Sequence, residues 1–195
     1  MDRLSTLAIA LALPLALGSC ESKKEEPQSR VNTTKVAQKT VDTAAFCDVQ
    51  FPGTTGPKLT VPKLVGGELP PAAGKWQWIN VWATWCKPCV EEMPRLAQWR
   101  EKLGAAGKPY ELSFVSVDED EADLVAFKTD HPSTPASPRL AEPAKQADWY
   151  VSVGLDGGAP VPIHIFVEPT GHVRCARAGG VREQDYAAIE KLLSQ

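Results

Sequence analysis

Three features are scarce or missing in this sequence of 195 residues, and each absence excludes a class of protein. Lysine and arginine number 21 against 24 acidic residues, so the chain lacks the basic excess of a nucleic-acid-binding protein. The long apolar run from Leu4 to Leu17 is shorter than the roughly 20 residues that a membrane-spanning helix needs. Beyond Cys86 and Cys89, no pair of cysteines or of histidines is closely spaced, so a structural zinc site is not expected.

The apolar run instead has the pattern of an export signal. Arg3 precedes it and small residues follow it, so we expect a signal peptide over residues 1–19. The run ends in Leu17-Gly18-Ser19-Cys20, which is similar to a bacterial lipoprotein signal and implies lipidation of Cys20. An ordinary cleaved leader is the alternative, which Asp2 favours. With acyl chains on Cys20, the protein would be held at a membrane surface as an exported protein of the cell envelope.

The remaining chain has the size of one tethered domain. Residues 20–45 are polar and charged with scarcely a large apolar side chain, which predicts a flexible tether. Residues 46–195 are ordinary globular sequence and form the predicted domain.

Two cysteines three residues apart stand where an apolar, strand-like run meets a helix-like run. At a helix N-terminus, unpaired backbone N–H groups and the helix dipole stabilise a thiolate. We therefore expect Cys86 to be the attacking thiolate and Cys89, one turn later, to be the resolving thiol. Lys87 adds a positive charge, and Pro88 suits a first helical turn, so both are candidates for tuning the dithiol. This pattern predicts redox chemistry that needs no cofactor and no metal.

Strand-like and helix-like segments alternate around the dithiol. Residues 46–74 are rich in proline and glycine and predict an N-terminal hairpin or edge strand. The segments after residue 74 predict strands at 76–82, 110–117, 163–167 and 173–176, and helices at 90–103, 119–130, 144–153 and 183–193. The order βαβα then ββα, with the dithiol after the first of these strands, predicts a thioredoxin-like α/β fold: a central mixed β-sheet flanked by helices.

The motif WATWCKPCVEEMP, with Val161-Pro162 ahead of the strand IHIFVEPTG, resembles the TlpA/ResA-like branch of the thioredoxin superfamily. Members are membrane-tethered thiol-disulfide oxidoreductases of the bacterial envelope, and the resemblance covers roughly residues 61–195. It implies that Pro162 is a cis-proline against the dithiol and that the Val161 backbone receives a substrate strand. It also implies that Trp85 caps the dithiol and contacts the substrate.

Two further positions bear on the base that activates Cys89. Asn80 stands where thioredoxin has a buried aspartate that helps to deprotonate the second thiol, and an asparagine cannot do this. Glu92 matches the family's active-site glutamate and lies on the same helical face as Cys89, so we assign the role of general base to Glu92. The alternative for Glu92, and the preferred interpretation of Glu91, is a first-turn acid that the helix dipole favours.

The resulting hypothesis is an envelope thiol-disulfide oxidoreductase that reduces disulfides in exported proteins, with apocytochrome c as one such substrate and a membrane thiol carrier as electron donor. The direction cannot be read from the sequence, because potentials within this fold span about 150 mV. A thiol peroxidase would need Thr-x-x-Cys, which neither Cys86 nor Cys89 has, and a copper-delivery protein would need Cys-x-x-x-Cys with a suitably placed histidine. A non-catalytic binding module on the same scaffold is the third alternative.

Several other side chains could take part in chemistry but are interpreted mainly as structural. Cys47 and Cys175 form an even pair that could be a structural disulfide in an oxidising compartment or two separate buried thiols. His164 is more simply a hydrogen-bonded histidine of the core or edge than a ligand. The tryptophans other than Trp85 are interpreted as core or groove packing, at positions 76, 78, 82, 99 and 149.

Overall fold

The structure is a computed structural model that describes residues 41–71 and 73–195. The predicted signal peptide, Cys20 and most of the predicted tether lie outside the described residues. Packing begins before residue 46, because Thr43 is buried and its hydroxyl accepts a hydrogen bond of 2.9 Å from the Gln50 amide. Within the described part of the chain, no helix combines the length and apolar character needed to cross a membrane.

A mixed sheet of seven strands forms the centre, in the order β1, β7, β6, β3, β4, β5, β2. β3 is parallel to β4 and antiparallel to β6, and β6 forms an antiparallel hairpin with β7. The strands are β1 (Val49–Gln50), β2 (Leu64–Val65), β3 (Trp76–Trp82), β4 (Tyr110–Ser116), β5 (Arg139–Leu140), β6 (Ile163–Val167) and β7 (Val173–Ala178). All seven residues of β3 are buried, as its nearly continuous apolar run predicts for a central strand.

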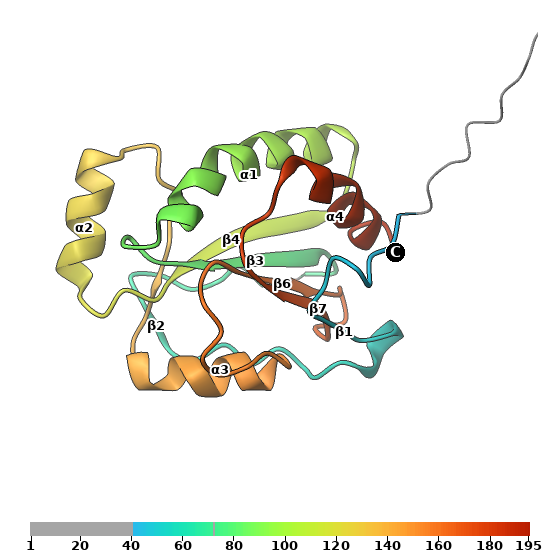
Figure 1. Ribbon diagram of the computed structural model, residues 1–195, viewed down its shortest axis with the longest axis horizontal. Helices are drawn as coiled ribbons and strands as arrows, with labels where there is room; N and C mark the ends of the chain where they lie inside the picture. Colours follow the sequence, from blue (N-terminus) through green and yellow to red (C-terminus); the bar gives the residue numbers. More distant parts are fainter. Residues whose placement is uncertain (1–40, 72) are drawn as a thin grey trace, which may run out of the picture. The chain divides into compact units, whose positions relative to one another are not determined.

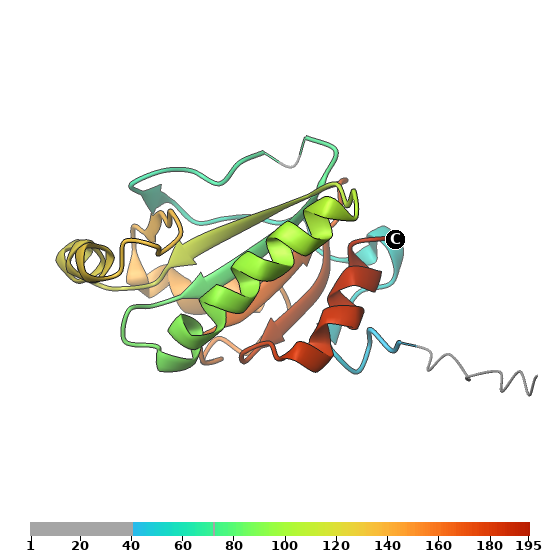
Figure 2. The ribbon, with the colours of Figure 1, turned by 90° about the horizontal axis from the view of Figure 1, so that it is seen from above.

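Helices cover both faces of this sheet. They are α1 (Lys87–Ala105), α2 (Glu121–Asp130), α3 (Gln146–Ser152) and α4 (Tyr186–Leu192), with short 3-10 helices at Gly53–Thr55, Pro143–Lys145 and Glu183–Asp185. α1 and α4 lie on one face, α3 lies on the other, and α2 lies to the side (Figure 1). Seen from above, α1 runs along the sheet with α4 beside it (Figure 2).

The predicted thioredoxin-like α/β architecture is confirmed, with one correction. The segment 46–74, predicted to form a hairpin or an edge strand, forms edge strands in its described residues, because β1 pairs with β7 and β2 pairs with β5 at the opposite edge. α1 begins at Lys87, three residues before the predicted start at Val90. Its first turn is set by the Cys86 cap and Pro88 rather than by the apolar spacing from which the helix was predicted.

Aromatic side chains fill the core beneath α1. Trp78 of β3 is fully buried, stacks on Phe166 with 5.2 Å between ring centroids and lies 6.4 Å from the Trp99 ring of α1. Trp76, Trp82 and Trp149 are also buried, so the five tryptophans interpreted as packing residues all lie in the interior.

A disulfide joins the segment before β1 to β7. Cys47 and Cys175 are bonded at 2.03 Å across a sequence separation of 128 residues, which resolves the alternatives that the sequence left open. The same junction is held by the Arg177 guanidinium, which donates to the Phe46 carbonyl at 2.7 Å. In the chain-entropy description, a loop of this length stabilises the fold by up to about 5 kcal/mol.

Candidate active site

The two closely spaced cysteines lie where the buried strand β3 passes into α1. Cys86 is the N-cap of α1, and its sulfur accepts the Cys89 N–H at 3.3 Å. The two sulfurs form a disulfide, and only 4% of Cys86 and none of Cys89 is exposed. When the bond is reduced, the Cys86 sulfur stays at the helix end where backbone N–H groups favour a negative charge.

A buried carboxylate fixes the loop that leads to Cys86. Both carboxylate oxygens of Asp118 accept the Thr84 N–H, at 3.0 and 3.2 Å, and one also accepts the Thr84 hydroxyl at 2.7 Å. The Ser116 hydroxyl donates to the second oxygen at 2.6 Å. The sequence analysis gave Asp118 no role. The signal was present, because a Ser-x-Asp at the end of a strand parallel to the dithiol strand places the aspartate beside the dithiol loop.

Pro162 lies at the same end of the sheet as the dithiol. Ile163 pairs with Val81, so Pro162 comes next to the point where β3 ends and the dithiol loop begins. The Val161-Pro162 peptide bond is cis, and the Pro162 carbonyl accepts the Gly179 N–H at 2.8 Å.

The side chains next to the cysteines face the solvent. Trp85 is 66% exposed, the largest exposed fraction among the big apolar residues in the described part of the chain. Lys87 lies 3.6 Å from Glu91, and both side chains are mostly exposed. This contact is therefore a surface ion pair of small energy. Trp85 thus offers apolar contact area beside the dithiol, while part of the Lys87 charge is engaged by Glu91.

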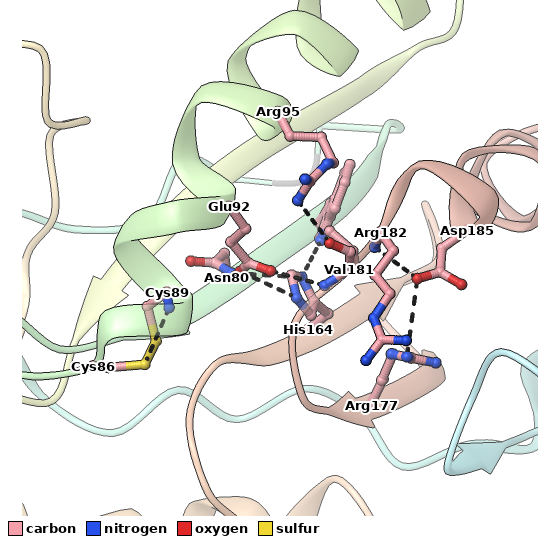
Figure 3. A network of polar contacts seen from close by, with 11 residues as sticks. Asn80, Cys86, Cys89, Glu92, Arg95, His164, Arg177, Val181, Arg182 and Asp185 are labelled. Carbon is pink, nitrogen blue, oxygen red and sulfur yellow. Dashed lines mark hydrogen bonds and ion pairs between the residues drawn. A yellow bond between two sulfur atoms is a disulfide. The ribbon is translucent and has the colours of Figure 1, made fainter.

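Glu92 has a different environment from its neighbour Glu91. Its side chain is 2% exposed, and the Asn80 amide, the Val181 N–H and the His164 ring surround the carboxylate (Figure 3). One oxygen accepts the Asn80 amide at 2.8 Å and lies 3.3 Å from Nε2 of His164, and the other accepts the Val181 N–H at 2.8 Å. Among residues 41–71 and 73–195, no lysine or arginine forms an ion pair with it.

The sheet register explains why Asn80 and His164 meet at Glu92. Asn80 of β3 pairs with His164 of β6, so both side chains leave the sheet on the same face. Glu92 reaches them from α1, three residues after Cys89 and on the same side of the helix. The sequence analysis missed His164 and Val181 as partners of Glu92. For His164 the only signal was its place in a strand two residues after Pro162, and nothing in the sequence gave its face.

No metal centre accompanies the dithiol in the described part of the chain, where no three histidine, cysteine, aspartate or glutamate side chains gather in ligating geometry. Burial raises the pKa of Tyr110, at the start of β4, to about 12.

Comparison with known proteins places this site in a family. The model of the AhpC/TSA family matches residues 52–176, well over half of the chain. The chain belongs to the AhpC/TSA family. This assignment confirms the thioredoxin-like membership that the dithiol motif predicted.

The relatives with assigned names include several thiol-disulfide oxidoreductases. ResA of Bacillus thuringiensis subsp. konkukian is 35% identical over 132 residues, a match that covers 62% of this chain and 66% of ResA. ResA of Bacillus anthracis is 27% identical over 123 residues with the same coverage. The chain therefore spans just under two thirds of the length of these relatives.

Solved structures confirm the fold. A putative thiol:disulfide interchange protein DsbE from Chlorobium tepidum superposes with a TM-score of 0.55 at 23% identity, covering 71% of this chain and 94% of that one. A thiol:disulfide interchange protein from Bacteroides sp. gives a TM-score of 0.54 at 22% identity, covering 72% and 91%.

Proposed function

We propose that this protein is a thiol-disulfide oxidoreductase that acts through Cys86 and Cys89. The observation that carries the proposal is the position of the disulfide: its first sulfur caps α1, where a helix end stabilises a thiolate. The names of the ResA relatives support the same chemistry.

The reaction begins from the reduced dithiol. The Cys86 thiolate attacks one sulfur of a substrate disulfide, forms a mixed disulfide and releases the other substrate sulfur as a thiolate. Glu92 takes the proton from the Cys89 thiol, and the new thiolate attacks the Cys86 sulfur. This step releases the second substrate thiolate and restores the Cys86–Cys89 disulfide. Two electrons pass to the substrate, so a thiol donor must reduce the dithiol again.

We assign substrate binding to the Trp85 side chain and to the backbone of Val161. Trp85 offers an exposed apolar surface beside Cys86. Val161 precedes the buried Pro162, and in the described part of the chain its N–H and C=O form no backbone hydrogen bond. An extended substrate segment that carries a cysteine can therefore pair with Val161 as an added strand.

We further propose that the protein works in the bacterial cell envelope, held there through a lipid on Cys20, and reduces disulfides in exported proteins. The N-terminal pattern supports export, and the buried Cys47–Cys175 disulfide suits an oxidising compartment. Apocytochrome c is a candidate substrate, and a membrane thiol carrier is the candidate electron donor.

A thiol peroxidase is disfavoured within the same family. The residues three positions before Cys86 and Cys89 are Ala83 and Cys86, so neither cysteine has the threonine that a peroxidatic thiol needs. Peroxide consumption that is driven by a dithiol reductant and lost in Cys86→Ser would reverse this assignment.

Trapping tests the proposed function. The full chain with Cys89→Ala is expected to retain mixed disulfides through Cys86, which a reductant releases, because the resolving thiol is absent. The double variant Cys86→Ser/Cys89→Ala is the matched control and should retain none. Equal capture by both variants, or failure of the wild-type protein to exchange with any disulfide, would contradict the proposal.

A further inference from the structure

His164 is a buried histidine that the proposed reaction does not use. It is fully buried in β6, with Nδ1 3.1 Å from the indole nitrogen of Trp78 and Nε2 3.3 Å from the carboxylate of Glu92. The Asn80 amide nitrogen also faces Nδ1, at 3.5 Å. The imidazole therefore lies between a tryptophan of the core and the carboxylate of Glu92, the residue one helical turn after Cys89.

These partners decide which ring nitrogen carries the proton. An indole N–H can only donate a hydrogen bond, so Nδ1 of His164 must accept it and must be unprotonated. The Asn80 nitrogen is a second donor directed at the same atom. The neutral ring then carries its hydrogen on Nε2, the nitrogen that faces Glu92.

We infer that Trp78 and Asn80 lock His164 as a neutral Nε2–H donor, and that His164 thereby positions Glu92 for proton exchange with Cys89. This inference rests on the proposed function, in which Glu92 is the base. Because the single lone pair of the ring is occupied by Trp78, His164 has no site for a proton from Glu92. The proton stays between Cys89 and Glu92.

The charged groups around the cluster fit this arrangement. Arg95 lies one turn after Glu92 on α1, but its guanidinium donates to the Val181 carbonyl at 2.9 Å and pairs with Glu183 at 3.0 Å. Glu92 binds the N–H of Val181 (Figure 3). Arg177, which pairs with His164 between β6 and β7, donates to the Phe46 carbonyl at 2.7 Å and lies 4.0 Å from Asp185. Among these residues, Glu92 and His164 are the titratable pair in contact, at 3.3 Å.

The packing also leaves little room for Glu92 to move. A Cβ added at Gly180 would lie 3.2 Å from the Glu92 oxygen that binds Val181 and 3.8 Å from the Pro162 ring. The loop after β7 therefore closes over the carboxylate on the side opposite Asn80 and His164. A carboxylate enclosed in this way keeps one orientation, which proton exchange with a neighbouring thiol requires.

Nitrogen NMR of His164 shows which ring nitrogen carries the hydrogen, and it does so without any assay of disulfide exchange. We expect Nδ1 to be unprotonated and Nε2 to be protonated. Trp78→Phe removes the indole N–H and should let the hydrogen redistribute between the two ring nitrogens. A wild-type ring that is protonated on Nδ1 would overturn the inference.

The pH profile of disulfide exchange tests the positioning role. His164→Leu removes the donor, so the resolving step should slow by about tenfold and its midpoint should move to higher pH. His164→Gln supplies an amide donor and should recover most of the rate, while His172→Gln, at a hairpin turn, is the matched control.

The results distinguish the proposed oxidoreductase function from the positioning role of His164. Absence of exchange in the wild-type protein contradicts the proposed function, whatever the NMR result. Normal exchange with identical profiles for wild type, His164→Leu and His164→Gln contradicts only the positioning role. Should His164→Leu fail to fold, His164→Phe takes its place as the variant without a donor: a slower resolving step than in His164→Gln supports the role, and equal profiles overturn it.

Discussion

The described part of the chain contains two disulfides with similar burial and different surroundings. None of Cys175 and 9% of Cys47 is exposed, against none of Cys89 and 4% of Cys86, so accessibility does not distinguish them. The Cys47–Cys175 bond links β7 to a segment 128 residues away, whereas the Cys86–Cys89 bond spans one turn at the start of a helix. Helix-end donors surround only the second bond, so local electrostatics rather than exposure assigns the redox role to it.

Removing the Cys47–Cys175 bond should have the largest effect on stability. The double variant Cys47→Ala/Cys175→Ala should lose up to about 5 kcal/mol of unfolding free energy in denaturant titrations, because the unfolded chain gains the freedom of a long loop. Disulfide exchange per folded molecule should be unchanged. A large loss of exchange in the folded fraction would mean that the two bonds do not have separate roles.

Glu92→Gln should slow the dithiol chemistry strongly and lower the unfolding free energy by about 1 to 3 kcal/mol, because its amide nitrogen would face one of the buried N–H donors. The amide matches the carboxylate in size but cannot take a proton, so the resolving step should slow by about 100-fold in single-turnover kinetics. Glu91→Gln, a change on the exposed neighbour, is the matched control and should stay within about twofold. Equal effects of the two changes would remove Glu92 from the mechanism.

Asp118→Ala should loosen the loop before Cys86. It leaves the Thr84 N–H and the Ser116 hydroxyl without their acceptor, at a cost of about 2 kcal/mol of unfolding free energy. The attack by Cys86 should slow more than the resolving step, because Asp118 holds the loop that carries Cys86. Rapid-mixing measurements of mixed-disulfide formation check this order, and a slower resolving step alone would contradict it.

Lys87→Ala should have the smallest effect. Its ion pair with Glu91 is exposed, so stability should change by less than about 0.5 kcal/mol. The attack rate should fall about twofold at low salt and less at high salt, because ions screen a surface charge. A salt-independent loss of tenfold or more would show that Lys87 contributes to the dithiol more strongly than its exposed position indicates.

The sequence predicted correctly the features that depend on residues within a few positions of one another. The apolar strand, the cysteine spacing and the helix that follows identified Cys86 and Cys89, and helical spacing placed Glu92 on the face of Cys89. These inferences need only neighbours within a few residues.

The sequence did not predict the contacts that depend on which strands pair. His164 meets Glu92 because β6 lies beside β3. His164 pairs with Asn80, which is 84 positions earlier in the chain, and no local sequence pattern predicts that pairing. For the same reason the contact between Cys47 and Cys175 was left open. Of the two alternatives for the N-terminal segment, a hairpin or an edge strand, the structure has edge strands, because β1 and β2 each pair with a strand far away in the sequence.

The measurement that tests the central claim most directly is the order in which the two disulfides open in a series of redox buffers, with alkylation of Cys86 and of Cys47 followed by mass spectrometry. Because the helix end stabilises the Cys86 thiolate, we expect Cys86–Cys89 to open first, between about −270 and −120 mV, while Cys47–Cys175 stays closed to below about −300 mV. Simultaneous opening, or earlier opening of Cys47–Cys175, would contradict the assignment of the redox role to the helix-capping dithiol.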